Sequence, residues 1–166
     1  MPQDLRRLQL ARHEKGQMSR TIRILLVDDF KPWRSFVASL LLKNPEWQII
    51  CQVSDGLEAI QKAQEFQPDL IVLDIGLPKL NGIDAAPSIR NVAPESKILF
   101  LSSNRTSEVA AAALSAGGHG YVVKSEAGNE LLLAIEAVLQ GERFVSSTFT
   151  GFDFTATEGQ SSGEFR

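Results

Sequence analysis

The stretch that most constrains this chain is a short apolar run that ends in an aspartate. Residues 70–73 are apolar throughout, with β-branched Ile71 and Val72 at their centre, and turn residues lie on either side. A run of this length and composition predicts a β-strand that is buried on both faces of a parallel sheet. Asp74 follows directly, and a carboxylate is costly to bury without partners. We therefore expect Asp74 at the mouth of the sheet, in the crevice where open α/β sheets bind ligands.

Strand-like and helix-like segments alternate along the rest of the chain. The expected strands are short apolar runs at 22–27, 47–53, 70–73, 97–101 and 120–123. Each is followed by a segment with apolar residues at helical spacing, at 32–43, 57–66, 83–92, 107–116 and 130–140. Strands that alternate with helices in this way predict an α/β fold with right-handed crossovers. The expected architecture is a doubly wound, five-stranded parallel sheet of the flavodoxin-like type, with strand order 2-1-3-4-5.

The length and the two ends of the chain indicate its domain organisation. With 166 residues, the chain is long enough for one domain of ordinary size. We expect residues 1–20 to be a flexible extension and residues 21–141 to form the domain. Residues 142–166 are rich in Ser, Thr and Gly and should be a mostly disordered tail, too short for a second domain. Some of its phenylalanines should dock on the core, and those beyond about Thr150 should be disordered.

Composition argues against several classes of protein. A net charge of −3 gives no electrostatic basis for direct binding to nucleic acid or to a membrane surface. The N-terminus lacks the apolar core of a signal peptide, and no run approaches the ~20 apolar residues of a membrane span, so the expected location is the cytoplasm. Cys51 is the only cysteine, which excludes an intrachain disulfide and a multi-cysteine metal site.

Polar residues follow four of the five expected strands. Asp28 and Asp29 follow the first, Asp74 the third, Ser102 the fourth and Lys124 the fifth. Because the carboxyl ends of parallel strands share one edge, the three carboxylates should converge there. Like charges at such spacing repel, and a divalent cation with oxygen ligands relieves the repulsion. The pattern therefore predicts a Mg²⁺ site, and the absence of His or Cys from the strand ends argues against zinc.

Each of these signals has an ordinary explanation when it is taken alone. The Asp28-Asp29 pair could be a solvated turn, Asp74 a cap for the following loop, Ser102 part of a turn and Lys124 a surface charge. The functional interpretation depends on all four occurring at the same structural position.

Together these segments resemble the receiver domain of two-component response regulators over roughly residues 21–141. The matching motifs are Ile24-Leu25-Leu26-Val27-Asp28-Asp29, Val53-Ser54-Asp55-Gly56-Leu57-Glu58-Ala59, the Asp74 stretch with Leu77-Pro78 and Asn81-Gly82, Leu99-Phe100-Leu101-Ser102, and Gly120-Tyr121-Val122-Val123-Lys124. Residues 124–126 and 134–138 resemble those of receivers that precede a helix-turn-helix DNA-binding domain.

The resemblance implies a role for each acidic residue. Asp74 would be the phosphoacceptor, taking its phosphoryl group from a histidine kinase or a phosphotransfer protein. Asp29 and Asp74 would bind Mg²⁺ directly, Asp28 would assist through water, and the backbone carbonyl of Gly76 would add a ligand.

The resemblance also implies how the signal would be transmitted. Ser102 would hydrogen-bond a phosphoryl oxygen, Lys124 would pair with the phosphoryl charge, and Tyr121 would turn inward when Ser102 moves. Ser125 stands where many receivers have a proline after a cis bond, which before a serine would cost about 3 kcal/mol. Gly76 offers no side chain to a hydrolytic water, which leaves the phosphoryl lifetime open.

The function that this resemblance implies is that of a single-domain response regulator. Phosphorylation would switch a surface for a downstream protein in phosphorelay signal transduction, with no catalysis beyond the chain's own phosphoryl transfer and slow dephosphorylation. A homodimer through the last two helices or the tail is a further option. The main alternative is the receiver portion of a transcription regulator whose DNA-binding domain is absent from this chain. A Mg²⁺-dependent phosphatase-like enzyme is a third option, but this chain has no second aspartate two residues after Asp74 to act as its acid. A receiver-shaped scaffold that never takes phosphate is a fourth, and the intact acidic set, Ser102 and Lys124 argue against it.

Overall fold

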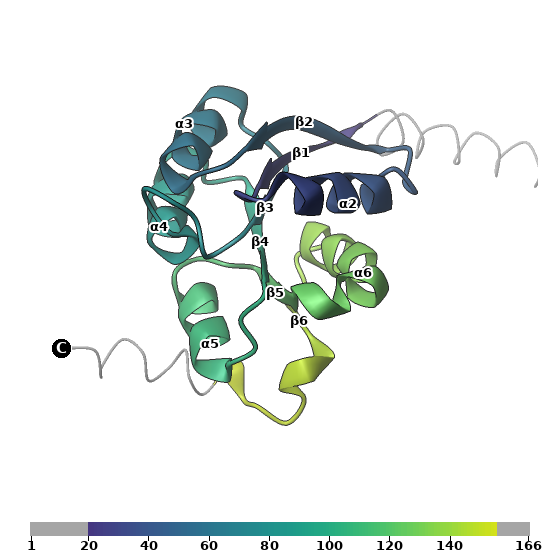
Figure 1. Ribbon diagram of the computed structural model, residues 1–166, viewed down its shortest axis with the longest axis vertical. Coiled ribbons are helices and arrows are strands. Elements are labelled where there is room, and N and C mark those ends of the chain that lie inside the picture. Colours follow the sequence, from purple (N-terminus) through teal and green to yellow (C-terminus); the bar gives the residue numbers. More distant parts are fainter. Residues whose placement is uncertain (1–19, 156–166) are drawn as a thin grey trace, which may run out of the picture.

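A parallel β-sheet lies between two layers of helices in the computed structural model, which describes residues 20–155 (Figure 1). The strands are β1 (Ile22–Val27), β2 (Trp47–Val53), β3 (Leu70–Leu73), β4 (Lys97–Ser102), β5 (Gly120–Val123) and β6 (Phe144–Val145). The helices are α2 (Lys31–Leu41), α3 (Gly56–Phe66), α4 (Gly82–Val92), α5 (Ser107–Ser115) and α6 (Ala127–Leu139), with short 3-10 turns η2 (Lys124–Glu126) and η3 (Ser147–Phe149). Residues 1–19 of the extension expected at 1–20, and the part of the expected tail beyond residue 155, lie outside the described residues.

The strand order confirms the predicted doubly wound topology. The sheet runs β2-β1-β3-β4-β5-β6, and every neighbouring pair is parallel. The last residue of β1, Val27, lies opposite Val53 of β2 on one side and Leu73 of β3 on the other. The residues that follow β1 and β3 are therefore neighbours at the carboxyl edge of the sheet.

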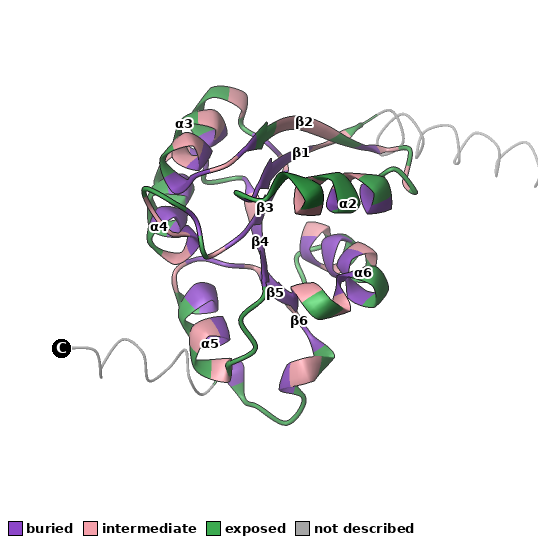
Figure 2. Cartoon of the chain, in the orientation of Figure 1, coloured by how far each residue is buried: buried purple, intermediate pink, exposed green. Residues whose placement is uncertain are grey.

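Helices cover both faces of the sheet, as the unbroken apolar runs of its central strands predict. Helices α3, α4 and α5 pack on one face, and α2 and α6 pack on the other (Figure 1). All four residues of β3 are buried, and Figure 2 shows that exposed residues concentrate on the outer sides of the helices. No helix in residues 20–155 has the length and apolar character needed to cross a membrane.

Short polar side chains determine where three of the helices begin. Asp55, Asn81 and Thr106 each accept a hydrogen bond from the backbone N–H three residues further on, which satisfies an otherwise unpaired donor of the first turn. Helix α6 starts at Ala127, three residues before the predicted start, because it continues directly from the 3-10 turn η2. Gly141 follows α6 with a φ of +88°, a conformation that glycine adopts without strain.

The chain adds a sixth strand after α6, where a mostly disordered tail was expected from residue 142. In β6, Phe144 lies opposite Gly120 of β5 and Val145 lies opposite Tyr121. The backbone N–H of Ser146 then donates to the carbonyl of Tyr121 over 2.9 Å. The predicted five-stranded sheet is therefore extended by one short edge strand.

Residues 144–154, called the C-terminal segment below, also complete the core beside β5. Phe149 and Phe154 are both buried, and the Phe149 ring meets Tyr121 edge-on with centroids 5.7 Å apart. The docking of Phe149 agrees with the expectation that some tail phenylalanines reach the core. The burial of Phe154 differs from the expectation of disorder beyond about Thr150.

Glu130 of α6 anchors the C-terminal segment. Its carboxylate accepts hydrogen bonds from the Ser146 hydroxyl at 2.6 Å and from the Ser147 hydroxyl and backbone N–H at 2.8 and 3.0 Å. The Ser146 hydroxyl oxygen in turn accepts from the N–H of Val123 at 2.8 Å. Burial alone raises the pKa of Glu130, but the bonds from Ser146 and Ser147 outweigh burial and lower that pKa below its ordinary value. This buried acid is therefore held charged and ties β5, α6 and the C-terminal segment together.

Candidate functional site

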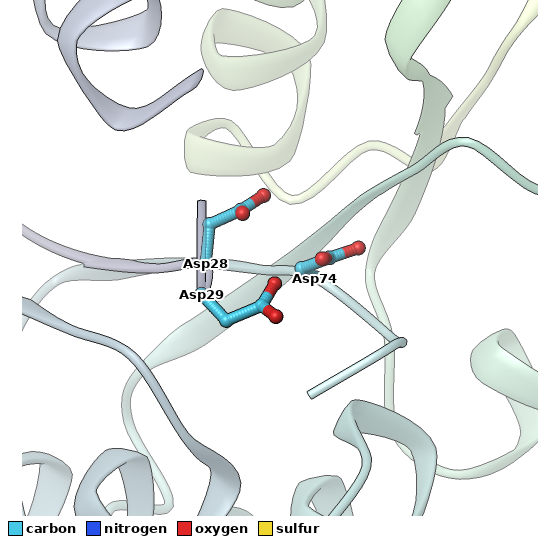
Figure 3. Close-up of side chains that lie close together, drawn as sticks. All are labelled: Asp28, Asp29 and Asp74. Carbon is cyan, nitrogen blue, oxygen red and sulfur yellow. The ribbon is translucent and has the colours of Figure 1, made fainter. Parts of the chain in front are cut away.

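Three aspartates gather at the carboxyl edge of the sheet. Asp28 and Asp29 follow β1, Asp74 follows β3, and each offers a carboxylate oxygen within 4.8 Å of the other two (Figure 3). Asp28 and Asp74 are buried, whereas Asp29 is exposed. The convergence that the sequence predicted is confirmed for these residues, and the group offers only oxygen ligands.

The loop after Asp74 packs tightly against it. Gly82, the first residue of α4, donates its N–H to the carbonyl of Ile75 at 2.8 Å. A side chain at Gly82 would collide with the carbonyl oxygen of Asp74, so only glycine lets the loop approach so closely. The Asn81-Gly82 pair thus fixes the turn that carries residues 75–80 over the site.

Lys124 supplies the positive charge at the centre of the acidic group. Its ammonium donates to Asp28 Oδ2 at 2.6 Å and lies 3.4 Å from Asp74 Oδ2. The other oxygen of each of these two carboxylates accepts a backbone N–H. Phe30 donates to Asp28 Oδ1 and Ile75 donates to Asp74 Oδ1, each at 2.8 Å. One ammonium therefore forms ion pairs with two buried carboxylates, and the carboxylate of Asp29 lies close to both.

The balance of these effects raises the pKa of Asp74. Burial is the largest cause, and the negative charge of Asp28 acts in the same direction. The charge of Lys124 and the N–H of Ile75 lower the pKa of Asp74 without cancelling the rise. The fold therefore accommodates the negative charge of Asp74 poorly. Either a nearby cation or the loss of that charge would be favourable.

A pH-dependent stability difference follows from this shift. Since the folded protein holds the Asp74 proton more tightly than the unfolded chain, the ionised carboxyl lowers stability above its folded pKa. Asp74→Asn should therefore unfold at a higher temperature than the parent protein at pH 7 without divalent cations. The advantage should shrink as the pH falls and vanish below about pH 3.8, the ordinary aspartate value. Thermal unfolding of both proteins across this range checks the prediction, and a parent protein that is the more stable at pH 7 would contradict it.

Ser102 and Asn104 connect the site to Tyr121. The Ser102 hydroxyl oxygen accepts from the N–H of Asn104 at 3.1 Å, and the Tyr121 hydroxyl donates to the carbonyl of Asn104 at 2.9 Å. The Tyr121 ring is fully buried, and the Phe149 ring packs edge-on against it. The movement of Tyr121 with Ser102 stays a prediction.

A cavity of about 470 Å³ opens beside these residues. It is lined by Asp74, Ile75, Gly76, Ser102, Ser103, Asn104 and Lys124. The predicted phosphoacceptor, hydroxyl and ammonium therefore face one space, and the backbone of Gly76 borders it. The described residues contain no cis peptide bond, so the bond between Lys124 and Ser125 is trans.

Two neighbours of the site were not predicted from the sequence. Trp33 of α2 presents its ring to the Lys124 ammonium, 5.2 Å from the ring centre, and Asn104 bridges Ser102 and Tyr121. The sequence pattern places Trp33 only among the apolar residues of the expected helix at 32–43. Its proximity to Lys124 depends on the packing of α2 against the sheet edge, which no local signal encodes.

Comparison with known proteins decides which family has this arrangement. The profile of the response regulator receiver domain matches residues 24–136. The chain belongs to this family. A two-component response regulator of the LuxR family from Aurantimonas sp. SI85-9A1 has a similar structure, with a TM-score of 0.74, 34% identity and coverage of 86% of this chain and 98% of that chain. The response regulator domain of Thermotoga maritima CheB aligns with a TM-score of 0.68 and 30% identity over 73% of this chain and 98% of that chain.

Curated relatives of this receiver domain include a transcriptional regulatory protein and an oxygen regulatory protein. The transcriptional regulatory protein DegU of Brevibacillus brevis is 30% identical over 129 residues, which cover 78% of this chain and 55% of that protein. The oxygen regulatory protein NreC of Staphylococcus epidermidis is 32% identical over 130 residues, which cover 78% of this chain and 60% of that protein. The chain thus spans little more than half the length of these relatives.

Proposed function

We propose that a phosphoryl group transferred to Asp74 switches a protein-interaction surface of this receiver domain. The grouping of Asp28, Asp29 and Asp74 with Lys124 beside one cavity carries the proposal. Phosphoryl transfer depends mainly on positioning and on stabilising negative charge, and these residues suit both tasks. The donor would be a phosphohistidine of a histidine kinase or phosphotransfer protein, and we propose the cytoplasm as the location.

The acidic group fits Mg²⁺. Its three carboxylates lie within 4.8 Å of one another and offer only oxygen ligands. Within residues 20–155, one ammonium, that of Lys124, is paired with this group, through Asp28 and Asp74. Asp29 and Asp74 would hold the ion, with Asp28 assisting and the backbone carbonyl of Gly76 as a further ligand. When bound, Mg²⁺ would neutralise negative charge on the transferring phosphoryl group.

The other roles in phosphoryl transfer would fall to side chains and backbone groups of this chain. An oxygen of Asp74 would form the new bond to phosphorus while the phosphorus–nitrogen bond breaks, and the electron pair would leave with the imidazole of the donor. The N–H of Ile75 holds Asp74 Oδ1 at 2.8 Å and so orients the carboxyl group. Lys124 would move from Asp28 and Asp74 towards the phosphoryl oxygens, and Ser102 would donate its hydroxyl to one of them.

The output would reach the surface through Asn104 and Tyr121. A phosphoryl group that draws Ser102 towards Asp74 would also move Asn104, because Asn104 is hydrogen-bonded to both Ser102 and Tyr121. The surface formed by α5, β5 and the C-terminal segment would change with it and bind a downstream protein or a second copy of the chain. Enzymatic turnover of an external substrate is not part of this proposal.

The lengths of the relatives favour a second candidate function. Because the matches cover only 55% of DegU and 60% of NreC, this chain could be the receiver portion of a transcription regulator. DNA binding would then belong to a domain outside this chain. Sequencing of the surrounding reading frame distinguishes the two, since only this candidate requires an in-frame helix-turn-helix segment.

Labelling by a small phosphodonor tests the proposed chemistry. Incubation with phosphoramidate and Mg²⁺ should add the mass of one phosphoryl group to the intact chain. Replacement of Mg²⁺ by EDTA should lower the initial rate at least about tenfold, since the carboxylates then repel the donor without compensation. Intact mass spectrometry over time measures both rates. An unlabelled protein in Mg²⁺, or a rate that chelation does not change, would refute the proposal.

A further inference from the structure

Trp33 contacts the cation on which the proposed chemistry depends. The Lys124 ammonium lies 5.2 Å from the centre of the Trp33 ring, within the distance at which a cation is attracted to an aromatic face. The side chain of Lys124 is only 16% exposed, so water screens this contact weakly. Around the ammonium, the described contacts are therefore two carboxylates, of Asp28 and Asp74, and one indole face.

Packing alone does not account for an indole at this position. Within residues 20–155, Trp33 Nε1 is the buried side-chain nitrogen or oxygen that has no hydrogen-bond partner. Buried tryptophans usually find a partner for this N–H, because an unsatisfied donor is costly. A phenylalanine would fill part of the same space against Phe36, whose ring centre lies 5.0 Å away, without that cost. The property that favours tryptophan here is its aromatic face, which binds cations more strongly than that of phenylalanine.

We infer that Trp33 is a positioning residue for Lys124 during phosphoryl transfer. This inference rests on the proposed function, in which Asp28 assists in holding Mg²⁺ and Lys124 moves from Asp28 and Asp74 towards the phosphoryl oxygens. Lys124 then loses its shortest contact, the 2.6 Å bond to Asp28. An aromatic face attracts the ammonium but offers Mg²⁺ no oxygen ligand, so it holds Lys124 at the cavity without competing for the metal.

A double-mutant cycle on the labelling rate tests the inference. Trp33→Leu removes the aromatic face and keeps an apolar side chain, and the labelling rate should fall about fivefold, equivalent to about 1 kcal/mol. Trp33→Phe should recover most of the rate, because a weaker aromatic face remains. In a Lys124→Gln background, Trp33→Leu should change the residual rate less than about 1.5-fold, since the cation is gone.

Trp47→Phe is the matched control. Trp47 is the only other tryptophan and begins β2, at the amino edge of the sheet away from the site, so this variant should label at the parent rate. Thermal unfolding of every variant, with Trp33→Met as a second apolar replacement, keeps the cycle decisive if one protein fails to fold. Effects of Trp33→Leu and Lys124→Gln that simply multiply, or a Trp33→Phe rate no better than that of Trp33→Leu, would overturn the inference. A Trp47→Phe protein and a parent that both stay unlabelled would instead refute the proposed function.

Discussion

Replacement of Asp74 with asparagine is expected to abolish phosphoryl labelling altogether. The amide is nearly the same size and can still accept the N–H that Ile75 donates to Asp74 Oδ1, so the fold should be retained. The amide oxygen is a poor nucleophile, however, and the change removes one of three carboxylates from the cation site. Intact mass after prolonged incubation with phosphoramidate and Mg²⁺ should show one phosphoryl group per parent chain and none on Asp74→Asn.

The matched control for this experiment is Asp84→Asn. Asp84 is an exposed aspartate in the first turn of α4, where it accepts from the side chain of Asn81 at 2.8 Å. The substitution makes the same chemical change outside the acidic group, and the label should be kept in full. If Asp74→Asn were labelled as completely as Asp84→Asn, another residue would be the phosphoacceptor and the site assignment would be wrong.

Much of this site could be predicted because its signals are local. Each of Asp28, Asp74, Ser102 and Lys124 lies at or directly after the end of an apolar run, and the run itself identifies the strand. Parallel topology then requires the carboxyl ends of the strands to meet at one edge. Neither step requires knowledge of how side chains pack, which explains why the acidic group and its lysine are found where the sequence pattern indicates.

The parts that were missed depend on contacts between distant segments. The C-terminal segment has no periodic pattern, and only two of its residues, Phe144 and Val145, form a strand. Its order comes from Glu130, a charged residue that sequence patterns assign to a helix surface. Such an anchor requires the serines to lie beside α6, and that proximity exists only once the sheet has formed. The same reasoning applies to Trp33 and Lys124, which are 5.2 Å apart in space and far apart in sequence.

Phe149→Ala is expected to destabilise the receiver domain by about 3 kcal/mol, as large-to-small changes at buried phenylalanines do. The Phe149 ring is 7% exposed and lies between Tyr121 and Phe154, with centroid distances of 5.7 and 5.8 Å. Its loss would leave a cavity beside Tyr121 and remove the contact that seats the C-terminal segment on the core. Urea denaturation at pH 7 measures the change as a shift of the unfolding midpoint.

Phe152→Ala provides the comparison that separates this role from general hydrophobicity. Phe152 belongs to the same segment and lies 4.6 Å from Phe154, yet it is 41% exposed, so its loss should cost less than about 1 kcal/mol. Equal losses of stability for the two variants would mean that the segment contributes only nonspecific apolar contact.

Tyr121 is the only tyrosine, so isotope-labelled tyrosine reports on its ring alone. That signal should change in Phe149→Ala and stay the same in Phe152→Ala, because, of these two phenylalanines, Phe149 is the one that packs against the Tyr121 ring, through which the proposed switch acts.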